Sequence, residues 1–157
     1  MTGNDIEPVE DLIVTVRRRR VILSADLARI YGVPTKALNQ AIRRNTDRFP
    51  PDFALRVSRA DVDRIRRLRS QSVTLKRGVH AKYDSLGFTE HGAIMAATVL
   101  NSPRAVQMSI FVVRVFLRLR EVAQGQVELA AQLSKLERRV AGHDHELRRI
   151  INTLRRR

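Results

Sequence analysis

Short runs of apolar and β-branched residues predict the strands of this chain. Residues 13–16 and 21–23 are β-prone and are separated by the four arginines 17–20, a pattern typical of a hairpin with a basic turn. Residues 53–57 alternate between apolar and other side chains, which predicts a third strand. The segment 73–83 is compatible with a second hairpin with a basic tip or with a mobile loop.

Helical spacing of apolar residues and suitable end signals predict the helices. The predicted spans are 25–31, 35–45, 59–69, 89–100 and a final helix from 103 that continues past 121. Hydroxyl side chains suited to capping stand at or near four helix starts, namely Ser24, Thr35, Ser58 and Thr89. Gly32 follows the first helix, where a left-handed backbone costs glycine little. In the helix 59–69 we expect Val62, Ile65 and Leu68 to point inward and the arginines to point largely outward, these being Arg64, Arg66, Arg67 and Arg69.

The C-terminal part of the chain carries a long heptad pattern. A strict 4–3 spacing selects Val115, Leu119, Val122, Gln126, Leu129, Leu133, Leu136, Val140, His143, Leu147, Ile150 and Leu154, of which ten are apolar. This predicts a coiled coil, in which Gln126 and His143 are polar flaws that can fix register. In a parallel pair Arg139 faces Asp144 of the partner. We expect a homodimer held by Leu129, Leu133, Leu136, Val140, Leu147, Ile150 and Leu154, with a higher oligomer or another partner as the alternatives.

These elements indicate a mainly α fold with short β-hairpins, of the α+β class. The expected organisation is an acidic disordered lead over 1–11, a folded domain over 12–120 and a coiled-coil helix over 121–157.

The distribution of charge points to a polyanionic partner. The chain carries a formal net charge of +14, and residues 12–124 hold 22 basic against 8 acidic residues. A folded domain this basic attracts polyanions. Nucleic acid is the first candidate partner, and an anionic membrane or an acidic protein is the second. A bias in codon usage explains a preference for Arg over Lys, but it does not explain the shortage of acids.

Composition excludes several classes of chemistry. Without cysteine there are no disulfides, no thiol catalysis and no Cys-ligated metal. The four histidines have no metal-ligand spacing, and no phosphate loop, nucleophile elbow or catalytic acid pair is recognisable. No window has the roughly 20 apolar residues of a membrane helix, and the N-terminus lacks the order of a signal peptide. We therefore expect no enzyme activity, no cofactor and no metal in a soluble, intracellular protein.

The segment 24–44 matches the template of a helix-turn-helix. Apolar or small side chains occupy the spacing at which the two helices pack, and Gly32 stands where the chain must turn. The packing positions are Leu27, Ala28, Tyr31, Val33, Leu38 and Ala41. An ordinary helical hairpin is the alternative interpretation.

If the motif is real, its second helix presents side chains suited to the major groove. Asn and Gln pair with adenine, while Arg and Lys pair with guanine or contact phosphates. We expect Lys36, Asn39, Gln40 and Arg43 to face bases and Thr35 and Arg44 to touch the backbone. A merely solvated helix face is the alternative for each residue alone.

Two other basic segments are candidate phosphate contacts. The tip formed by Lys76, Arg77 and Gly78, with Lys82 beside it, has the composition of a wing that grips the DNA backbone. The turn 17–20 is a second candidate. A solvated loop is the alternative in both cases.

Several stretches resemble a known family. Leu23-Ser24-Ala25-Asp26-Leu27-Ala28-Arg29-Ile30-Tyr31-Gly32-Val33, followed by Thr35-Lys36-Ala37-Leu38-Asn39, resembles the start of the KilA-N-like phage DNA-binding domains, in the branch named for the N-terminal part of a phage open reading frame six. Further support comes from 48–53, 88–93, 101–106 and 114–118, which extend the resemblance over roughly 12–120. His91 stands where Gln is expected, and 73–82 does not align. The resemblance implies DNA binding by a phage, prophage or bacterial protein. It also implies a location in the cytoplasm of a bacterial host cell, in association with the nucleoid.

The combined prediction is a sequence-specific binder of double-stranded DNA, a transcriptional regulator that dimerises through its C-terminal helix. An antirepressor-like adaptor, acting through protein contacts of the coiled coil, is the main alternative. A non-specific nucleic-acid or RNA binder is a weaker one, because stacking aromatic residues are scarce.

Overall fold

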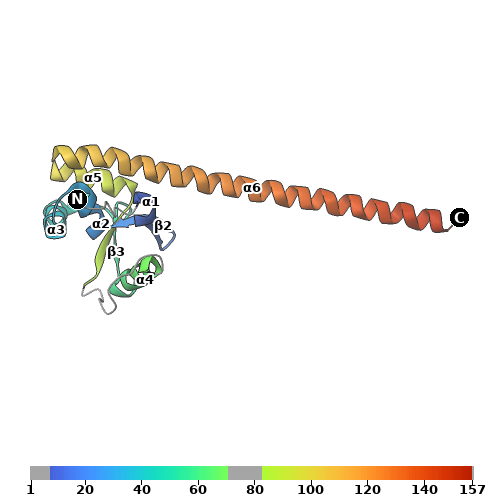
Figure 1. Cartoon of the computed structure of the whole chain (residues 1–157), viewed down its shortest axis with the longest axis horizontal. Coiled ribbons are helices and arrows are strands. Elements are labelled where there is room, and N and C mark those ends of the chain that lie inside the picture. Colours follow the sequence, from blue (N-terminus) through green and yellow to red (C-terminus); the bar gives the residue numbers. More distant parts are fainter. Residues whose placement is uncertain (1–7, 71–82, 157) are drawn as a thin grey trace, which may run out of the picture. The chain divides into compact units, whose positions relative to one another are not determined.

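A computed structural model describes residues 8–70 and 83–156, and the chain divides into two compact units, Met1–Leu117 and Arg118–Arg157. The first unit combines several helices with one small sheet, and the second consists of the C-terminal part of one long helix (Figure 1). This is the α+β class, mainly helical, that the sequence predicts.

Four short strands form one antiparallel sheet in the order β1-β2-β4-β3. Their bounds are β1 Ile13–Val16, β2 Arg19–Leu23, β3 Ala54–Val57 and β4 Ser85–Phe88. Ile22 and Ala54 both lie opposite Phe88 in the register, so three apolar side chains line one face.

The strand β4 was not predicted. It has only four residues, and Gly87 interrupts any alternation. The glycine is needed for packing, because a Cβ built there would lie 3.0 Å from methyl groups of Val21 and Val57. β4 is nonetheless central, since it pairs with both β2 and β3.

The predicted first hairpin is confirmed, with a tighter turn than expected. Arg17 and Arg18 alone form the turn, with φ of 49° and 68°, while Arg19 and Arg20 belong to β2. Positive φ at both central residues suits the twist of a two-residue hairpin. The Arg17 Nη2 donates to the carbonyl oxygen of Arg56 at 3.1 Å, which ties the turn to β3.

The helices are α1 Val9–Leu12, α2 Ser24–Tyr31, α3 Thr35–Arg44, the short 3-10 helix η1 Thr46–Arg48, α4 Arg59–Ser70, α5 Glu90–Leu100 and α6 Pro103–Arg155. Five of them, α2 to α6, follow the predicted order, while α1 and η1 were not predicted. Residues 9–11, expected to belong to a disordered lead, are instead helical, and the side chain of Val9 is buried. Pro103 begins α6 and Asn101 ends α5 with a left-handed backbone, as suits a break between two helices.

Two of the four predicted helix caps are correct. Ser58 Oγ accepts from the backbone N–H of Asp61 at 3.2 Å, and Thr89 Oγ1 accepts from Gly92 at 3.4 Å. Ser24 and Thr35 are instead the first helical residues, after Leu23 and Pro34, and neither helix has a side-chain cap. Ser24 is buried, and its hydroxyl hydrogen-bonds the Ser85 hydroxyl at 3.1 Å, so its side chain joins α2 to β4.

Helices cover both faces of the sheet. Val62 and Ile65 of α4 pack with Val21, Leu23 and Val57 on one face. On the other face, the ring of Phe88 lies edge-on to Phe49 at 6.2 Å. In Figure 1, α4 lies on the opposite side of the strands from α5.

The expected orientation of α4 is wrong at two residues. Leu68 is 63% exposed, so it does not join the core. The side chain of Arg69 is only 15% exposed, because it turns inward to a buried carboxylate. The predicted hairpin at 73–82 lies outside the described residues.

Candidate nucleic-acid interface

Helices α2 and α3 pack against each other across a three-residue turn. Leu27 and Leu38 are fully buried, and Ala28 is nearly so. Gly32 has φ of 71°, and the N–H of Val33 donates to the carbonyl of Ala28 at 3.0 Å. Glycine adopts this left-handed geometry without the cost that a Cβ imposes, so it closes α2 and redirects the chain into α3.

The packing of α3 differs in detail from the prediction. Val33 and Ala41 are only half-buried, while Ile42 is buried and completes the apolar side with Leu38. Because Leu38 and Ile42 stand four residues apart, they lie on one side of the helix. The opposite side is left to solvent.

Four of the six predicted DNA-contacting residues on α3 are exposed. They are Lys36, Gln40, Arg43 and Arg44. Thr35 is half-buried as the first residue of the helix. Asn39 is also half-buried, and its Oδ1 is enclosed without a hydrogen-bond partner among the described residues. The prediction that α3 exposes Thr35 and Asn39 freely is therefore wrong, because both stand at the border between the apolar and the solvated side.

Hydrogen bonds hold the C-terminal end of α3. The amide of Asn45 donates to the carbonyl of Ala41 at 2.8 Å, and the hydroxyl of Thr46 donates to that of Arg43 at 2.8 Å. They satisfy carbonyls that a helix end leaves without partners. The exposed side chains therefore project from a helix whose C-terminal end is held by side-chain hydrogen bonds.

A buried tyrosine anchors the preceding helix. The Tyr31 hydroxyl donates to the carbonyl oxygen of Ala93 in α5 at 2.7 Å. Burial raises the pKa of Tyr31 well above its usual value, because the phenolate would lose its hydration. The hydroxyl remains a donor at physiological pH and ties α2 to α5.

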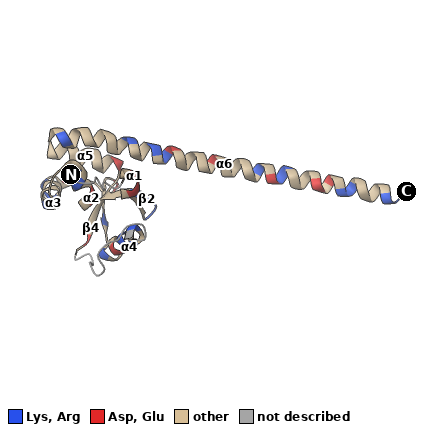
Figure 2. Ribbon diagram, viewed as in Figure 1, with Lys and Arg blue, Asp and Glu red and all other residues tan. Residues whose placement is uncertain are grey.

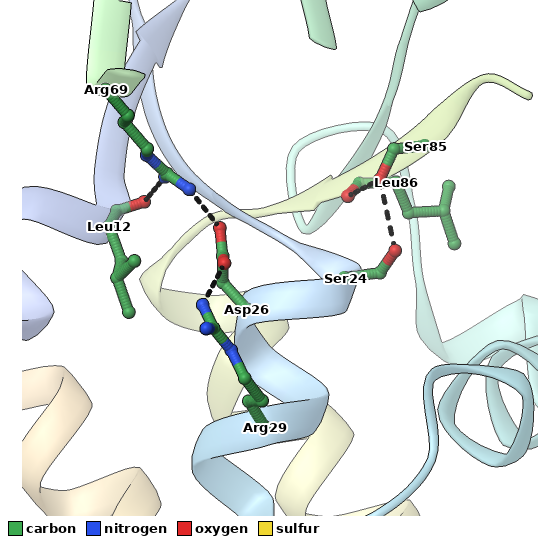
Figure 3. A network of polar contacts seen from close by, with 7 residues as sticks. All are labelled: Leu12, Ser24, Asp26, Arg29, Arg69, Ser85 and Leu86. Carbon is green, nitrogen blue, oxygen red and sulfur yellow. Dashed lines mark hydrogen bonds and ion pairs between the residues drawn. The ribbon is translucent and has the colours of Figure 1, made fainter. Parts of the chain in front are cut away.

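A buried ion network fixes α2 to α4 (Figure 3). Asp26 accepts from Arg29 at 2.7 Å and from Arg69 at 2.8 Å. The second terminal nitrogen of Arg69 donates to the carbonyl oxygen of Leu12 at 3.0 Å. The network joins α2 to the end of α4 and to the end of α1. It therefore stabilises the position of α2, the helix against which α3 packs.

Basic residues occur on α3 and α4 (Figure 2). The predicted wing residues Lys76, Arg77 and Lys82 lie outside the described residues, so their role stays a prediction. In the described ranges 8–70 and 83–156, no three potential metal-ligating side chains lie together. Across the same ranges, no helix has both the length and the apolar character needed to cross a membrane.

The side chains at the heptad positions of α6 differ in burial between the two units. Val115 is 1% exposed and belongs to the core of the first unit, so its assignment to an interhelical seam is wrong. Ala105, Met108 and Val112 precede it at the same 3–4 spacing and are buried or half-buried. In the second unit Leu119 is half-buried. The other apolar heptad positions of that unit are exposed, namely Val122, Leu129, Leu133, Leu136, Val140, Leu147, Ile150 and Leu154.

A profile of the ORF6N domain, a phage-type domain, matches residues 11–99, which is more than half of the chain. The match includes α2, α3 and the whole sheet, while α6 lies beyond it. No curated protein and no solved structure matches the chain. The predicted branch, named for phage open reading frame six, is confirmed: the chain belongs to the ORF6N domain family.

Proposed function

We propose that this protein binds double-stranded DNA sequence-specifically, as a phage or prophage regulator, with α3 in the major groove and a homodimer formed through α6. It acts by binding, without catalysis, in the cytoplasm of a bacterial host. The observation that carries the proposal is the exposed polar side of α3. There Lys36, Gln40, Arg43 and Arg44 stand opposite the buried Leu38 and Ile42.

The chemistry of this exposed side suits the edges of base pairs. Gln40 has the donor and acceptor that adenine requires, and Lys36 and Arg43 have donors for guanine. Lys36, Gln40 and Arg43 follow at spacings of four and three, so they share one side of the helix. Arg44 lies beside them and is suited to a phosphate.

The exposed apolar stripe on α6 supports a dimer. An isolated helix gains no stability from apolar side chains that stay in water. A second copy presents the same 4–3 stripe and can bury both. An in-register parallel pair also places Arg139 near Asp144 of the other chain, where opposite charges favour that orientation.

Dimerisation connects to recognition through symmetry. Two copies related by a two-fold axis present two α3 helices, so the preferred duplex contains two inverted half-sites. The linkage raises the affinity of each domain through a high effective concentration.

Gln40→Ala is expected to reduce discrimination rather than binding as a whole. Loss of one paired base contact weakens the free energy of binding to the preferred duplex by about 1–3 kcal/mol. It changes binding to a scrambled duplex little. Binding is measured on a duplex enriched from a random pool and on its scrambled form. The control is Gln107→Ala, the same change at an exposed position of α6. Equal loss on both duplexes, or none, contradicts base reading by Gln40.

Leu133→Asp is expected to separate the dimer into monomers at micromolar concentration. A carboxylate inside the seam loses hydration without gaining a partner, and two of them repel each other. Sedimentation measures the mass. Ser134→Asp, one residue along and outside the seam, serves as the matched control and should remain dimeric. A monomeric parent protein, or a Leu133→Asp variant that stays dimeric, refutes the predicted seam.

An antirepressor-like adaptor is the second candidate, favoured by the length of the exposed apolar stripe on α6. An adaptor uses that stripe to hold a different protein and enriches no DNA motif from a random pool. The two candidates are therefore separated by whether a motif emerges.

A further inference from the structure

A hollow of about 690 Å³ opens beside α3. Its walls come from α3 and η1, from β3, from the start of α4, and from β4 with the two residues before it. Residues far apart in the sequence therefore meet next to the helix proposed to read DNA.

Three arginines from three elements line this hollow. They are Arg43 of α3, Arg56 of β3 and Arg59 of α4, and all are exposed. Arg17 adds a fourth guanidinium near β3, because it donates to the carbonyl oxygen of Arg56 at 3.1 Å. We name Arg43, Arg56 and Arg59 the arginine cluster.

One acidic residue, Asp84, lies among the residues that line the hollow. Its Oδ2 lies 3.2 Å from Arg56 Nε, and its Oδ1 accepts from the backbone N–H of Arg59 at 3.0 Å. This carboxylate therefore holds Arg56 by one edge, while the terminal guanidinium nitrogens carry further donors. One carboxylate does not balance the cluster, so the hollow favours an anion.

We infer that Arg56 and Arg59 bind phosphodiester groups of the DNA strand that passes α3. This inference rests on the proposed function and adds a second contact surface to it. Arg43 connects the two surfaces, because it stands on the exposed side of α3 and also lines the hollow. Guanidinium groups suit phosphate oxygens through their fork of parallel N–H donors.

Contacts of this kind strengthen binding without reading sequence. Each neutralised phosphate contributes about 0.9 to the slope of log affinity against log salt concentration. Arg56→Ala combined with Arg59→Ala should make that slope less steep by roughly 2, and affinity should fall alike on preferred and scrambled duplexes. Arg64→Ala combined with Arg67→Ala removes the same charge from exposed positions of α4 outside the hollow and should change the slope little.

Further variants keep the outcomes decisive. Arg56→Lys with Arg59→Lys retains the charge and should retain most of the slope. If the double alanine variant does not fold, Arg59→Ala alone should reduce the slope by roughly 1. An unchanged slope in the variants, with normal binding by the parent protein, overturns the inference and leaves the proposed function standing. No duplex binding by the parent protein overturns both.

Discussion

Asp26→Ala is expected to lower the free energy of unfolding by about 3–5 kcal/mol, the usual cost of removing one partner from a buried ion pair. The substitution leaves Arg69 largely buried without the carboxylate that it contacts at 2.8 Å. Denaturant-induced unfolding measures the loss at a fixed protein concentration.

Asp61→Ala provides the matched control for Asp26. Asp61 also pairs with an arginine of α4, Arg64 at 3.1 Å, but the Arg64 side chain is 63% exposed. Exposed pairs contribute about 0–1 kcal/mol, so this variant should unfold nearly like the parent. If the two variants lose similar amounts of unfolding free energy, Asp26 does not stabilise the position of α2 through its buried contacts.

Gly92→Ala is expected to destabilise the protein by about 3 kcal/mol, because a Cβ at this position overlaps the carbonyl group of Phe53. That carbonyl oxygen accepts hydrogen bonds from the backbone and side chain of Thr89, at 3.0 and 3.2 Å. The start of α5 therefore cannot move away from Phe53 without breaking these two hydrogen bonds. Thermal unfolding at equal protein concentration shows the effect.

The control for this prediction is Gly142→Ala in α6. A Cβ at Gly142 meets nothing within 4 Å, and alanine favours a helix interior over glycine by about 1 kcal/mol. This variant should be as stable as the parent or more stable. A Gly92→Ala protein that unfolds like the parent is incompatible with the close approach of α5 to Phe53.

Local signals in the sequence predicted most of the helices, and non-local packing explains what they missed. Ser58, Thr89 and Gly32 act within a few residues of the helix ends that they mark, so their roles are visible in the chain. Arg69 turns inward toward Asp26, 43 residues away, and no periodicity reveals such a pairing.

The same distinction applies to β4. Its four residues have no alternation of their own, and pairing with β2 and β3 makes them a strand. Ser24 has the composition of a helix cap, but the approach of Ser85 gives its hydroxyl another partner.

The candidate site was predictable in outline. Spacing along the helix correctly identified Lys36, Gln40, Arg43 and Arg44 as exposed, because a helix with buried Leu38 and Ile42 must show its other side to solvent. Asn39 is half-buried and lines the hollow beside α3, which spacing along the helix alone does not reveal. The positions of Arg56 and Arg59 depend on how β3 and α4 approach α3, which the sequence does not reveal.

Site-specific cross-linking tests most directly whether α3 lies in the DNA groove. A photoreactive residue replaces Gln40 in one variant and Gln107 in another, and each is irradiated with the enriched duplex. Position 40 should cross-link to bases within the enriched motif, while position 107 should give no cross-link. Binding of that duplex without a cross-link from position 40, or with equal cross-linking from both positions, would contradict recognition by α3.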